Sequence, residues 1–351
     1  DGSGFGLGVL NATINRNAYT GTEAITAAYA MVDMKVAPKL RLLAGARLEI
    51  TDIEVISQDE NIDPGVLDNT DILPALNLTY ELKENMNLRF AYSRTLARPV
   101  FREIAPFESF EFVGDYNKAG NPELERTTID NLDLRWEVYP NPGELITLSA
   151  FYKNFNDPIE FAILSQAQGS NRTIQPRNSP SANAFGFEIE IRKRLDFISE
   201  SLANFSIGGN FSYNFTEVTI DSTELAEDRA IDPNAEDTRR LYAQSPYVVN
   251  AFLNYDNYNI GLSANLNFNV FGERLSAIGP EGTPDVFEQP RPTLDFTVAK
   301  DIGEKWNIRF RARNLINPDY EQIYEYLGVE YIFNSYQIGR TFSLSVKYLI
   351  D

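Results

Sequence analysis

The chain has 351 residues and a net charge of −19, from 31 basic and 50 acidic side chains, and it contains neither cysteine nor histidine. Because nucleic-acid phosphates are bound by basic patches, this balance argues against a nucleic-acid partner and favours a solvated acidic surface. Without thiol or imidazole groups the chain cannot build zinc–histidine sites or histidine-activated nucleophiles. We therefore expect no enzyme, no catalytic or metal site and no cofactor.

Hydrophobic residues make up 43% of the chain and aromatic residues 12%. No apolar run approaches the roughly 18 residues of a transmembrane helix, but alternation would dilute the apolar residues of a membrane barrel in this way. No linker or change of composition divides the chain, so we expect one architecture throughout. Asp1 is not followed by the basic and apolar regions of a signal peptide, so we expect a mature product or a fragment.

The N-terminal third is predicted to form a loop and then two strand pairs. The first 21 residues are rich in glycine and asparagine and have no sustained period, which predicts a loop. A long acidic connection is predicted at 53–71, where Asp63-Pro64-Gly65 is a turn signal. A second long loop is predicted at 99–126. The expected strands are 22–36 and 40–51, around a turn at 37–39, and 72–82 and 87–98, around a short connection at 83–86.

Residues 127–155 show the repeated unit most plainly. Apolar Leu134 and Trp136 alternate with polar Arg135 and Glu137, as in a strand with one greasy and one polar face. The prolines and glycine of 139–143 then predict a reversal. Each arm of this hairpin has about 12 residues, roughly twice the mean strand and enough for the 9–11 residues of a tilted transmembrane strand.

The remainder predicts seven more strands, so the chain has about 13. Long connections at 156–182, 218–245, 271–290 and 315–335 alternate with short ones, and all the long connections fall on one side. Short periplasmic turns and long extracellular loops are typical of an outer-membrane β-barrel. Apolar and polar residues also alternate in the strands of a soluble β-sandwich or propeller, but such long strands and one-sided loops are not expected of these folds. The seven strands are 183–194, 204–216, 246–255, 258–270, 291–302, 306–314 and 336–350, and the short connections among them are 195–203, 256–257 and 303–305.

An odd number of strands has a topological consequence. The first and last strands run in the same direction, so they cannot close an all-antiparallel barrel, and a bare edge in hydrocarbon is costly. We therefore expect the strands at 22–36 and 336–350 to pair with strands from elsewhere. Because alternate residues of a strand point to opposite sides, odd and even positions of each strand are predicted to lie on two different faces. Lipid should meet Leu134, Trp136, Phe205, Phe211, Leu262 and Phe268, whereas the lumen should receive Arg135, Asn210, Asn214, Asn265 and Arg311.

Four stretches are similar to the C-terminal barrel of TonB-dependent outer-membrane receptors, particularly those common in Bacteroidetes. They are SRTLARPVFREIAPF at 93–107, GNPELERTTIDNLDLRWE at 120–137 followed by LSAFYKNFNDPIE at 148–160, RARNLINPDYEQ at 311–322 and IGRTFSLSVKY at 338–348. The resemblance spans roughly 22–350. The chain departs from the pattern at its end, where Leu349, Ile350 and Asp351 follow Tyr348 although such barrels usually finish on an aromatic residue.

The resemblance implies that residues 1–351 are the C-terminal portion of a barrel of the 22-strand type with a plugged lumen, with 1–21 as an extracellular loop and 22–350 as the strands. It also implies that the plug, the early strands and the contact with TonB lie outside this chain. The implied location is the outer membrane of a Gram-negative cell, against lipid and lipopolysaccharide, with a surface lipoprotein as a possible further partner.

The function implied is import of a scarce nutrient, which would be a siderophore, a glycan or a peptide. One alternative is a receptor-derived barrel that serves as a structural subunit of a larger outer-membrane complex. A second alternative is a passive porin, which requires no plug.

Two long loops carry side chains suited to ligand binding. Aromatic and guanidinium groups meet at the strand end in 99–126, and tyrosines suited to stacking on a sugar or siderophore fill 315–335. The alternative is that the aromatics pack the loops or form an interfacial girdle, while the arginines pair with Glu103, Glu108 and Glu111. The candidate ligand-binding residues are Arg98, Phe101, Arg102, Phe107, Phe110, Tyr116, Tyr320, Tyr324, Tyr326 and Tyr331.

Charged side chains at lumen-facing positions are the third group of candidates. Given the resemblance, their simplest role is contact with a plug domain. The acidic connections 53–71 and 218–245 contain carboxylates of the kind that bind calcium, but without EF-hand spacing a solvated loop is favoured. The lumen-facing or plug-facing candidates are Arg135, Glu137, Glu188, Glu190, Arg192, Arg309, Arg311 and Arg313.

Overall fold

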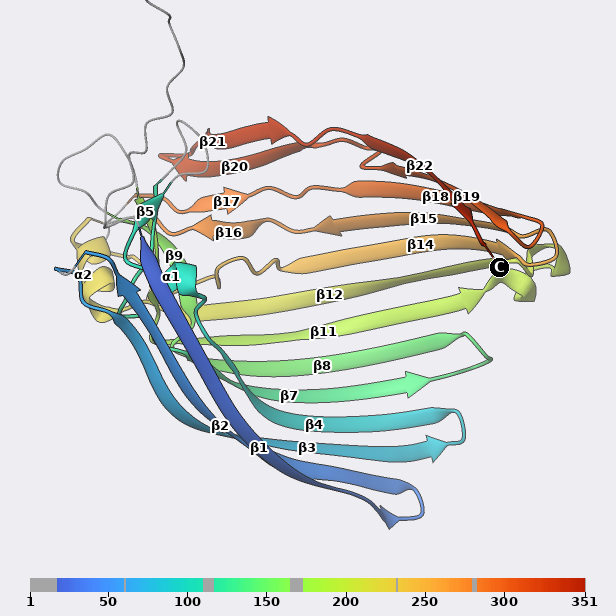
Figure 1. Cartoon of the computed structure of the whole chain (residues 1–351), viewed down its shortest axis with the longest axis horizontal. Coiled ribbons are helices and arrows are strands. Elements are labelled where there is room, and N and C mark those ends of the chain that lie inside the picture. The colour runs from blue at the N-terminus through green and yellow to red at the C-terminus, as the bar shows by residue number, and fades with distance from the viewer. Residues whose placement is uncertain are drawn as a thin grey trace, which may run out of the picture.

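The computed structural model describes residues 18–59, 61–109, 117–164, 173–231, 233–279 and 283–350. Its main feature is a curved, 14-stranded antiparallel sheet, in which thirteen strands follow one another in sequence order and a short strand, β13 (Thr238–Arg239), pairs with β12 (Figure 1). The predicted all-β barrel fold with about 13 strands is confirmed. The thirteen strands are β1 (Tyr19–Ala37), β2 (Leu40–Ser57), β3 (Gly65–Lys83), β4 (Met86–Ala97), β7 (Thr127–Val138), β8 (Leu145–Asn156), β11 (Ser181–Arg194), β12 (Phe205–Thr219), β14 (Tyr247–Asn257), β15 (Leu262–Phe271), β18 (Thr293–Ile302), β19 (Trp306–Arg313) and β22 (Thr341–Tyr348).

The connections are sorted between the two ends of the sheet, as predicted. The short connections within each hairpin lie together at one end, here called the turn end, and the long connections lie at the other, the loop end (Figure 1). The turns use residues that tolerate positive φ, such as Gly143 at 82° and Gly303 at 62°. The connection between β11 and β12 is longer and contains two 3-10 helices, η2 (Leu195–Phe197) and η3 (Glu200–Leu202).

The strand register places the two parities on opposite faces of the sheet. Leu134 lies opposite Phe90 and Ala150, whereas Arg135 lies opposite Arg89 and Ser149. Following these pairs across all thirteen strands, the side chains predicted to face lipid share one face and those predicted to face the lumen share the other. We call them the apolar face and the polar face. Leu134 is 48% exposed, so no protein layer covers the apolar face there.

The sheet does not close on itself within the described residues. β1 pairs only with β2, and β22 pairs only with β19, so the two outermost strands have no backbone ladder between them. Both strands run in the same direction, because an even number of antiparallel steps separates them. As expected, 22–36 and 336–350 do not pair with each other in the part of the chain that the structure describes, and their pairing with strands from elsewhere stays a prediction.

The prediction of a long acidic loop at 53–71 is wrong. β2 continues to Ser57 and β3 begins at Gly65, so the two strands pair far beyond the expected boundary. The acidic residues of this region alternate with apolar ones. Buried Ile53, Val55 and Leu67 pack against the short helix α1 (Phe101–Ile104), which supports strands that extend past the membrane-spanning region.

Two further boundaries differ from the prediction. Residues 256–257 belong to β14, and the turn lies at 258–261, where Gly261 has a φ of 61° and the Asn257 side chain accepts a hydrogen bond from the Asn259 amide. The predicted loop 315–335 is a hairpin of β20 (Asp319–Tyr326) and β21 (Val329–Gln337). The last strand of the sheet therefore begins at Thr341 rather than at Tyr336.

The other long connections also fold. One small sheet joins β5 (Glu108–Ser109), β6 (Asn117–Ala119), β10 (Thr173–Asn178) and β9 (Ile159–Leu164), and a second joins β16 (Arg274–Ala277), β17 (Val286–Glu288), β20 and β21. An isolated bridge between Ala162 and Ile278 links the two. Connection 218–245 contains α2 (Ser222–Ile231). Among the described residues, no helix has the length and apolar character needed to cross a membrane.

Candidate ligand-binding site

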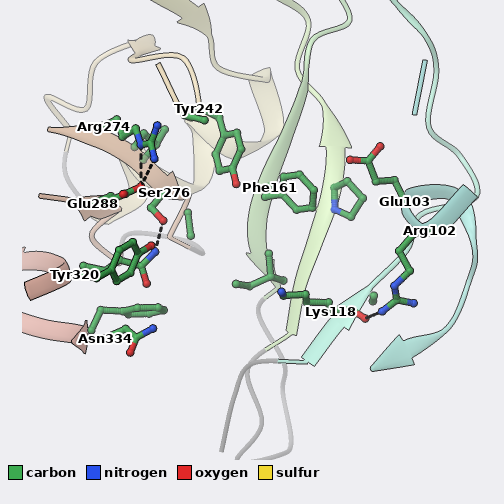
Figure 2. Close-up of a pocket in the computed structure, with 18 of the residues that line it drawn as sticks. Arg102, Glu103, Lys118, Phe161, Tyr242, Arg274, Ser276, Glu288, Tyr320 and Asn334 are labelled. Atoms are coloured by element: carbon green, nitrogen blue, oxygen red, sulfur yellow. Dashed lines mark hydrogen bonds and ion pairs between the residues drawn. The ribbon is translucent and has the colours of Figure 1, made fainter. Parts of the chain in front are cut away.

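A pocket of about 1220 Å³ opens at the loop end, between the two small sheets. Five long connections, each separated from the next by a strand pair, contribute side chains to it. Figure 2 shows Arg274, Glu288 and Tyr320 on one side and Arg102 and Lys118 across the space from them. The lining residues are Val100, Arg102, Glu103, Lys118, Ala119, Phe161, Ile174, Pro176, Tyr242, Ala243, Arg274, Leu275, Ser276, Ala277, Glu288, Tyr320, Gln322, Phe333, Asn334, Ser335 and Tyr336.

The first wall of the pocket is formed by α1, which a buried apolar cluster holds against β2 and β3. Buried Ile104 packs into the same cluster as Ile53, and the carboxylate of Glu103 accepts a hydrogen bond from the Val100 amide at 2.9 Å. The guanidinium of Arg102 stacks over Phe107, 3.8 Å from the ring centroid, and donates to the carbonyl of Lys118 at 3.3 Å. Burial lowers the pKa of Arg102 from its ordinary value. The wall therefore presents an oriented guanidinium.

The opposite wall is made by the sheet of β16, β17 and β20. Arg274 on β16 forms an ion pair with Glu288 on β17, with its Nη2 2.7 Å from Oε2. Tyr320 stacks on Tyr336 across the β20–β21 hairpin, with ring centroids 4.6 Å apart. Burial, reinforced by the Glu288 carboxylate, raises the pKa of Tyr320 to about 12. Its hydroxyl is thus protonated at neutral pH and can donate a hydrogen bond.

The pocket residues Phe161 and Tyr242 are held in place by the fully buried carboxylate of Glu160, which lies next to Phe161 in the chain. Glu160 accepts hydrogen bonds from Arg239 Nη2 at 2.8 Å, Ser179 Oγ at 2.5 Å and the Tyr242 amide at 3.1 Å. These contacts place Tyr242 beside Phe161, with ring centroids 5.4 Å apart. Burial raises the pKa of Tyr242, so its hydroxyl also keeps its proton. A buried carboxylate must have hydrogen-bond partners for its charge. Because those of Glu160 come from its own connection and from the connection between β12 and β14, Glu160 joins these two connections.

Of the predicted ligand-binding residues in 99–126 that the structure describes, only Arg102 lines the pocket. Arg98 lies elsewhere: it forms an ion pair with Glu49 and donates to Thr51 Oγ1 at 2.8 Å, so its partners are on β2 rather than in its own loop. Phe101 and Phe107 pack against the buried cluster beneath α1. Phe110 and Tyr116 lie outside the described residues.

Of the predicted tyrosines in 315–335, Tyr320 lines the pocket and the others do not. Tyr324 packs against a buried cluster and stacks on Tyr331, with ring centroids 5.3 Å apart. Tyr326 is 51% exposed near the tip of the β20–β21 hairpin. The pocket thus joins one residue from each of the two predicted loops, Arg102 and Tyr320, which are more than 200 residues apart in sequence.

The predicted lumen-facing charges all lie on the polar face, but their surroundings differ. The Glu137 carboxylate forms ion pairs with the guanidiniums of Arg89 at 2.6 Å and Arg135 at 3.3 Å. The Glu190 carboxylate forms ion pairs with those of Arg135 and Arg192, each at 3.7 Å. The arginines of β19 form no such pairs among the described residues. This second group is Arg309, Arg311 and Arg313.

Several pocket residues were not predicted, because no local pattern marks them. Phe161, Tyr242, Arg274 and Glu288 belong to four separate strands or turns that meet only in the folded loop end. Glu160 had one sequence signal, since it ends the run FYKNFNDPIE that resembles receptor barrels. Protonated phenols, an oriented guanidinium and aromatic faces together suit a polar ligand with rings or anionic groups.

Comparison with known proteins supports the fold. A model of a family described as "Outer membrane protein beta-barrel family" matches residues 8–348. No curated protein sequence matches the chain significantly.

Three solved structures that share this architecture are described as receptors or a transporter. The ferric citrate transporter FecA superposes with a TM-score of 0.64 at 14% identity, covering 94% of this chain and 46% of that one. The ferric enterobactin receptor PfeA from Pseudomonas aeruginosa gives 0.59 at 16% identity, with 93% and 45% covered. The siderophore receptor PirA from Pseudomonas aeruginosa gives 0.57 at 15% identity, with 93% and 49% covered. The chain therefore spans about half the length of these structures, and the likeness shows the fold.

Proposed function

Because this chain belongs to the outer membrane protein β-barrel family, we propose that it is the C-terminal part of a TonB-dependent transporter, of the type common in Bacteroidetes, that imports a scarce nutrient. The outer membrane is its location, and with short turns facing the periplasm the loop end faces the outside. The remaining strands, a plug and the contact with TonB would come from outside these residues. Lipopolysaccharide and a surface lipoprotein are the further partners proposed.

The observation that carries this proposal is the pocket at the outward-facing end. Five connections converge on one cavity of about 1220 Å³, and buried ionic contacts such as Glu160–Arg239 hold them in place. A passive pore needs no such organised concavity, whereas a receptor that captures dilute nutrients needs a preformed site. The nutrient class proposed is a siderophore, a glycan or a peptide. The three similar structures are a ferric enterobactin receptor, a siderophore receptor and a ferric citrate transporter.

The open sheet gives a second line of support. Within a membrane, the bare edges of β1 and β22 would leave rows of unsatisfied backbone groups, each costing several kcal/mol. An odd number of further strands would close an all-antiparallel barrel between them. Two copies of this chain would not serve, because their combined edge strands would again meet in parallel when both keep their loop ends outward.

The experiment is an uptake assay with the intact protein in its own cells. Deletion should reduce growth when one nutrient class is limiting, and Tyr320→Ala or Arg102→Ala should reproduce the defect at normal protein levels. Tyr326→Ala is the matched control, because Tyr326 lies on the same hairpin as Tyr320 but outside the pocket. Unchanged growth of the deletion strain on every class tested would contradict import, and a stable partner with a permanently blocked lumen would favour a structural subunit.

A further inference from the structure

One connection at the turn end is longer than the others and is folded. It joins β11 to β12 and runs from Leu195 to Asn204, where the sequence predicts a simple turn (Figure 1). The Ile198 amide donates to the Leu195 carbonyl at 3.0 Å within η2. The Asp256 amide donates to the Asn204 carbonyl at 2.9 Å and so fixes the end of the connection to the next hairpin. The connection is therefore an ordered element.

This ordered element exposes two large apolar side chains. Phe197 is 64% exposed and Ile198 is 62% exposed. The charged residues Asp196 and Glu200 of the same connection are exposed too, and the Asp196 carboxylate forms an ion pair with the Arg194 guanidinium at 3.0 Å. A short segment that presents both apolar and charged side chains is typical of the boundary between lipid and water.

The Phe197 ring lies beside the apolar face of the sheet. Lys193 has the same parity in β11 as Phe187, Ile189 and Ile191, so its side chain leaves the strand on the apolar face. The Lys193 Nζ atom lies 5.3 Å from the centroid of the Phe197 ring. The apolar face therefore continues past the end of β11 into the connection.

The charge of Lys193 is placed as at the edge of a bilayer. Its Nζ atom lies 2.7 Å from the carboxylate of Glu144, which belongs to the turn between β7 and β8. The charge is thus directed to the turn end, while the aliphatic stem stays on the apolar face. Lysines at membrane interfaces adopt this arrangement, in which the stem contacts the apolar region and the ammonium group reaches polar surroundings.

Aromatic pairs on the apolar face mark the same end of the sheet. Phe205, the first residue after the connection, packs on Tyr255 with ring centroids 4.8 Å apart. Trp306 packs on Tyr348 with ring centroids 4.6 Å apart. Because such rings gather at the headgroup level of membrane barrels, the connection begins at that level.

We propose that Phe197 and Ile198 insert into the headgroup region of the membrane leaflet that meets the turn end, so that this connection contacts lipid instead of lying in water. The partner is lipid rather than another protein, because the exposed pair continues the outward apolar face, which in an outer-membrane barrel meets lipid. The element would fix the depth of β11 and β12 in the bilayer. This inference does not depend on nutrient import, since it holds equally for a structural subunit or a passive pore.

The test measures the depth of nitroxide labels on the intact protein in phosphatidylcholine vesicles. These 351 residues contain no cysteine, so F197C and I198C provide single labelling sites once any cysteine outside them is replaced by serine. The measurement is the ratio of label collisions with oxygen, which concentrates in lipid, to collisions with a water-soluble nickel chelate. We expect a ratio severalfold higher for both variants than for E200C, the matched control in the same connection, and below that of L134C, the reference on the apolar face.

The outcomes decide between lipid, water and protein as the surroundings of this pair. Ratios equal to that of E200C overturn the proposal in favour of water, and exclusion of both reagents overturns it in favour of a protein partner. If F197C does not fold, I198C decides alone.

A second substitution tests whether apolar contact holds the element in the membrane. Adding F197D to I198C should lower the ratio to the value of E200C, because a carboxylate favours water over the headgroup boundary. A ratio that F197D leaves unchanged overturns insertion through Phe197.

Discussion

The wall of the sheet and its loop end are built on different principles. In the wall, polar contacts join neighbouring strands in register, as where Asn250 Nδ2 donates to Asn210 at 2.7 Å and Asn269 Nδ2 donates to Asn250 at 2.7 Å. At the loop end, Glu160 receives hydrogen bonds from residues 19, 79 and 82 positions away in sequence. The wall repeats one local rule, whereas the loop end depends on single contacts between distant segments.

The wall and the loop end should therefore differ in how well they tolerate amino-acid substitutions. A polar side chain on the polar face borders a lumen and can be replaced by another polar group with little cost. A buried ionic group at the loop end has no water to replace its partner, so its loss leaves an unpaired charge. Substitutions at the loop end should therefore cost more than substitutions on the polar face of the wall.

The largest effect is expected from Glu160→Ala. This change removes the nearer of two carboxylates from the Arg239 guanidinium, which is 9% exposed and keeps its ion pair with Glu224 at 3.1 Å. It also removes the acceptor of the Ser179 hydroxyl and the Tyr242 amide. Breaking a buried pair in this way should cost about 3–5 kcal/mol of loop-end stability. Limited proteolysis of the loop end across a urea series would measure it.

Glu188→Ala provides the control for that experiment. Glu188 lies on the polar face of β11 between Ser149 and Ser212, and its replacement should change stability by no more than about 0.5 kcal/mol. Equal losses of stability in Glu160→Ala and Glu188→Ala would show that the wall and the loop end do not differ in this respect.

The second effect tests the two faces of the wall. Leu134→Arg places a charge on the apolar face and should cost about 2–4 kcal/mol near the middle of the membrane, whereas Asn265→Arg on the polar face should cost little. Both variants would be unfolded in urea in the presence of lipid vesicles. Similar midpoints for the two would show that the faces are assigned incorrectly.

The third effect is a pH dependence of the loop end. Burial raises the pKa of Asp285 from 3.8 to about 6, against a hydrogen bond from the Gly279 amide that lowers it. The folded state then binds this proton more tightly than the unfolded state. The contribution of Asp285 to stability is therefore fully present below about pH 4 and is lost as the pH rises through about 6, by at most about 3 kcal/mol. Proteolytic susceptibility between pH 4 and 7 would measure it.

Asp285→Asn is the control for the pH experiment. The amide cannot titrate but can still accept the hydrogen bond from the Gly279 amide, so the decline with pH should flatten in this variant. An unchanged pH profile would assign the effect to another group.

The smallest effect is expected from Tyr320→Phe. The phenyl ring keeps its stacking on Tyr336, but the protonated hydroxyl is lost from the pocket wall. Loss of one hydrogen bond should weaken binding of the imported nutrient by about 0.5–1.5 kcal/mol. Equilibrium binding to the purified protein would show it, and Tyr326→Phe should bind as wild type does. A wild-type affinity in Tyr320→Phe would remove the hydroxyl from ligand recognition.

The alternation of side chains was enough to predict the wall. A strand assigns each residue to a face by parity alone, so Leu134 and Arg135 were placed on opposite faces before any contact was known. The alternation also continues into 53–71, although several acidic residues there predict a loop. Ile53 and Val55 alternate with Glu54 there, and the strand continues because α1 buries the apolar side.

The pocket was only half predictable. Loops rich in tyrosine and arginine were predicted to bind the ligand, and two of their residues, Arg102 and Tyr320, do line the cavity. Arg98 looked equivalent to Arg102 in sequence, yet it pairs with Glu49 on β2. No local pattern distinguishes these two arginines, because their partners lie on other strands.

Local sequence patterns specify the architecture of the wall, namely its thirteen strands, their order, their two faces and the end at which the long connections gather. They also specify the odd strand count that leaves two edges open among the described residues. These features follow from local backbone geometry, which repeats every two residues and needs no distant partner. Folding in three dimensions brings Glu160 to residues of a second connection and places Arg102 across a pocket from Tyr320. It also leaves the side chains of the β19 arginines without ion pairs among the described residues, whereas Arg135 has them. Such properties depend on which segments meet in space, and buried charges are satisfied by partners that the chain brings together only when it folds.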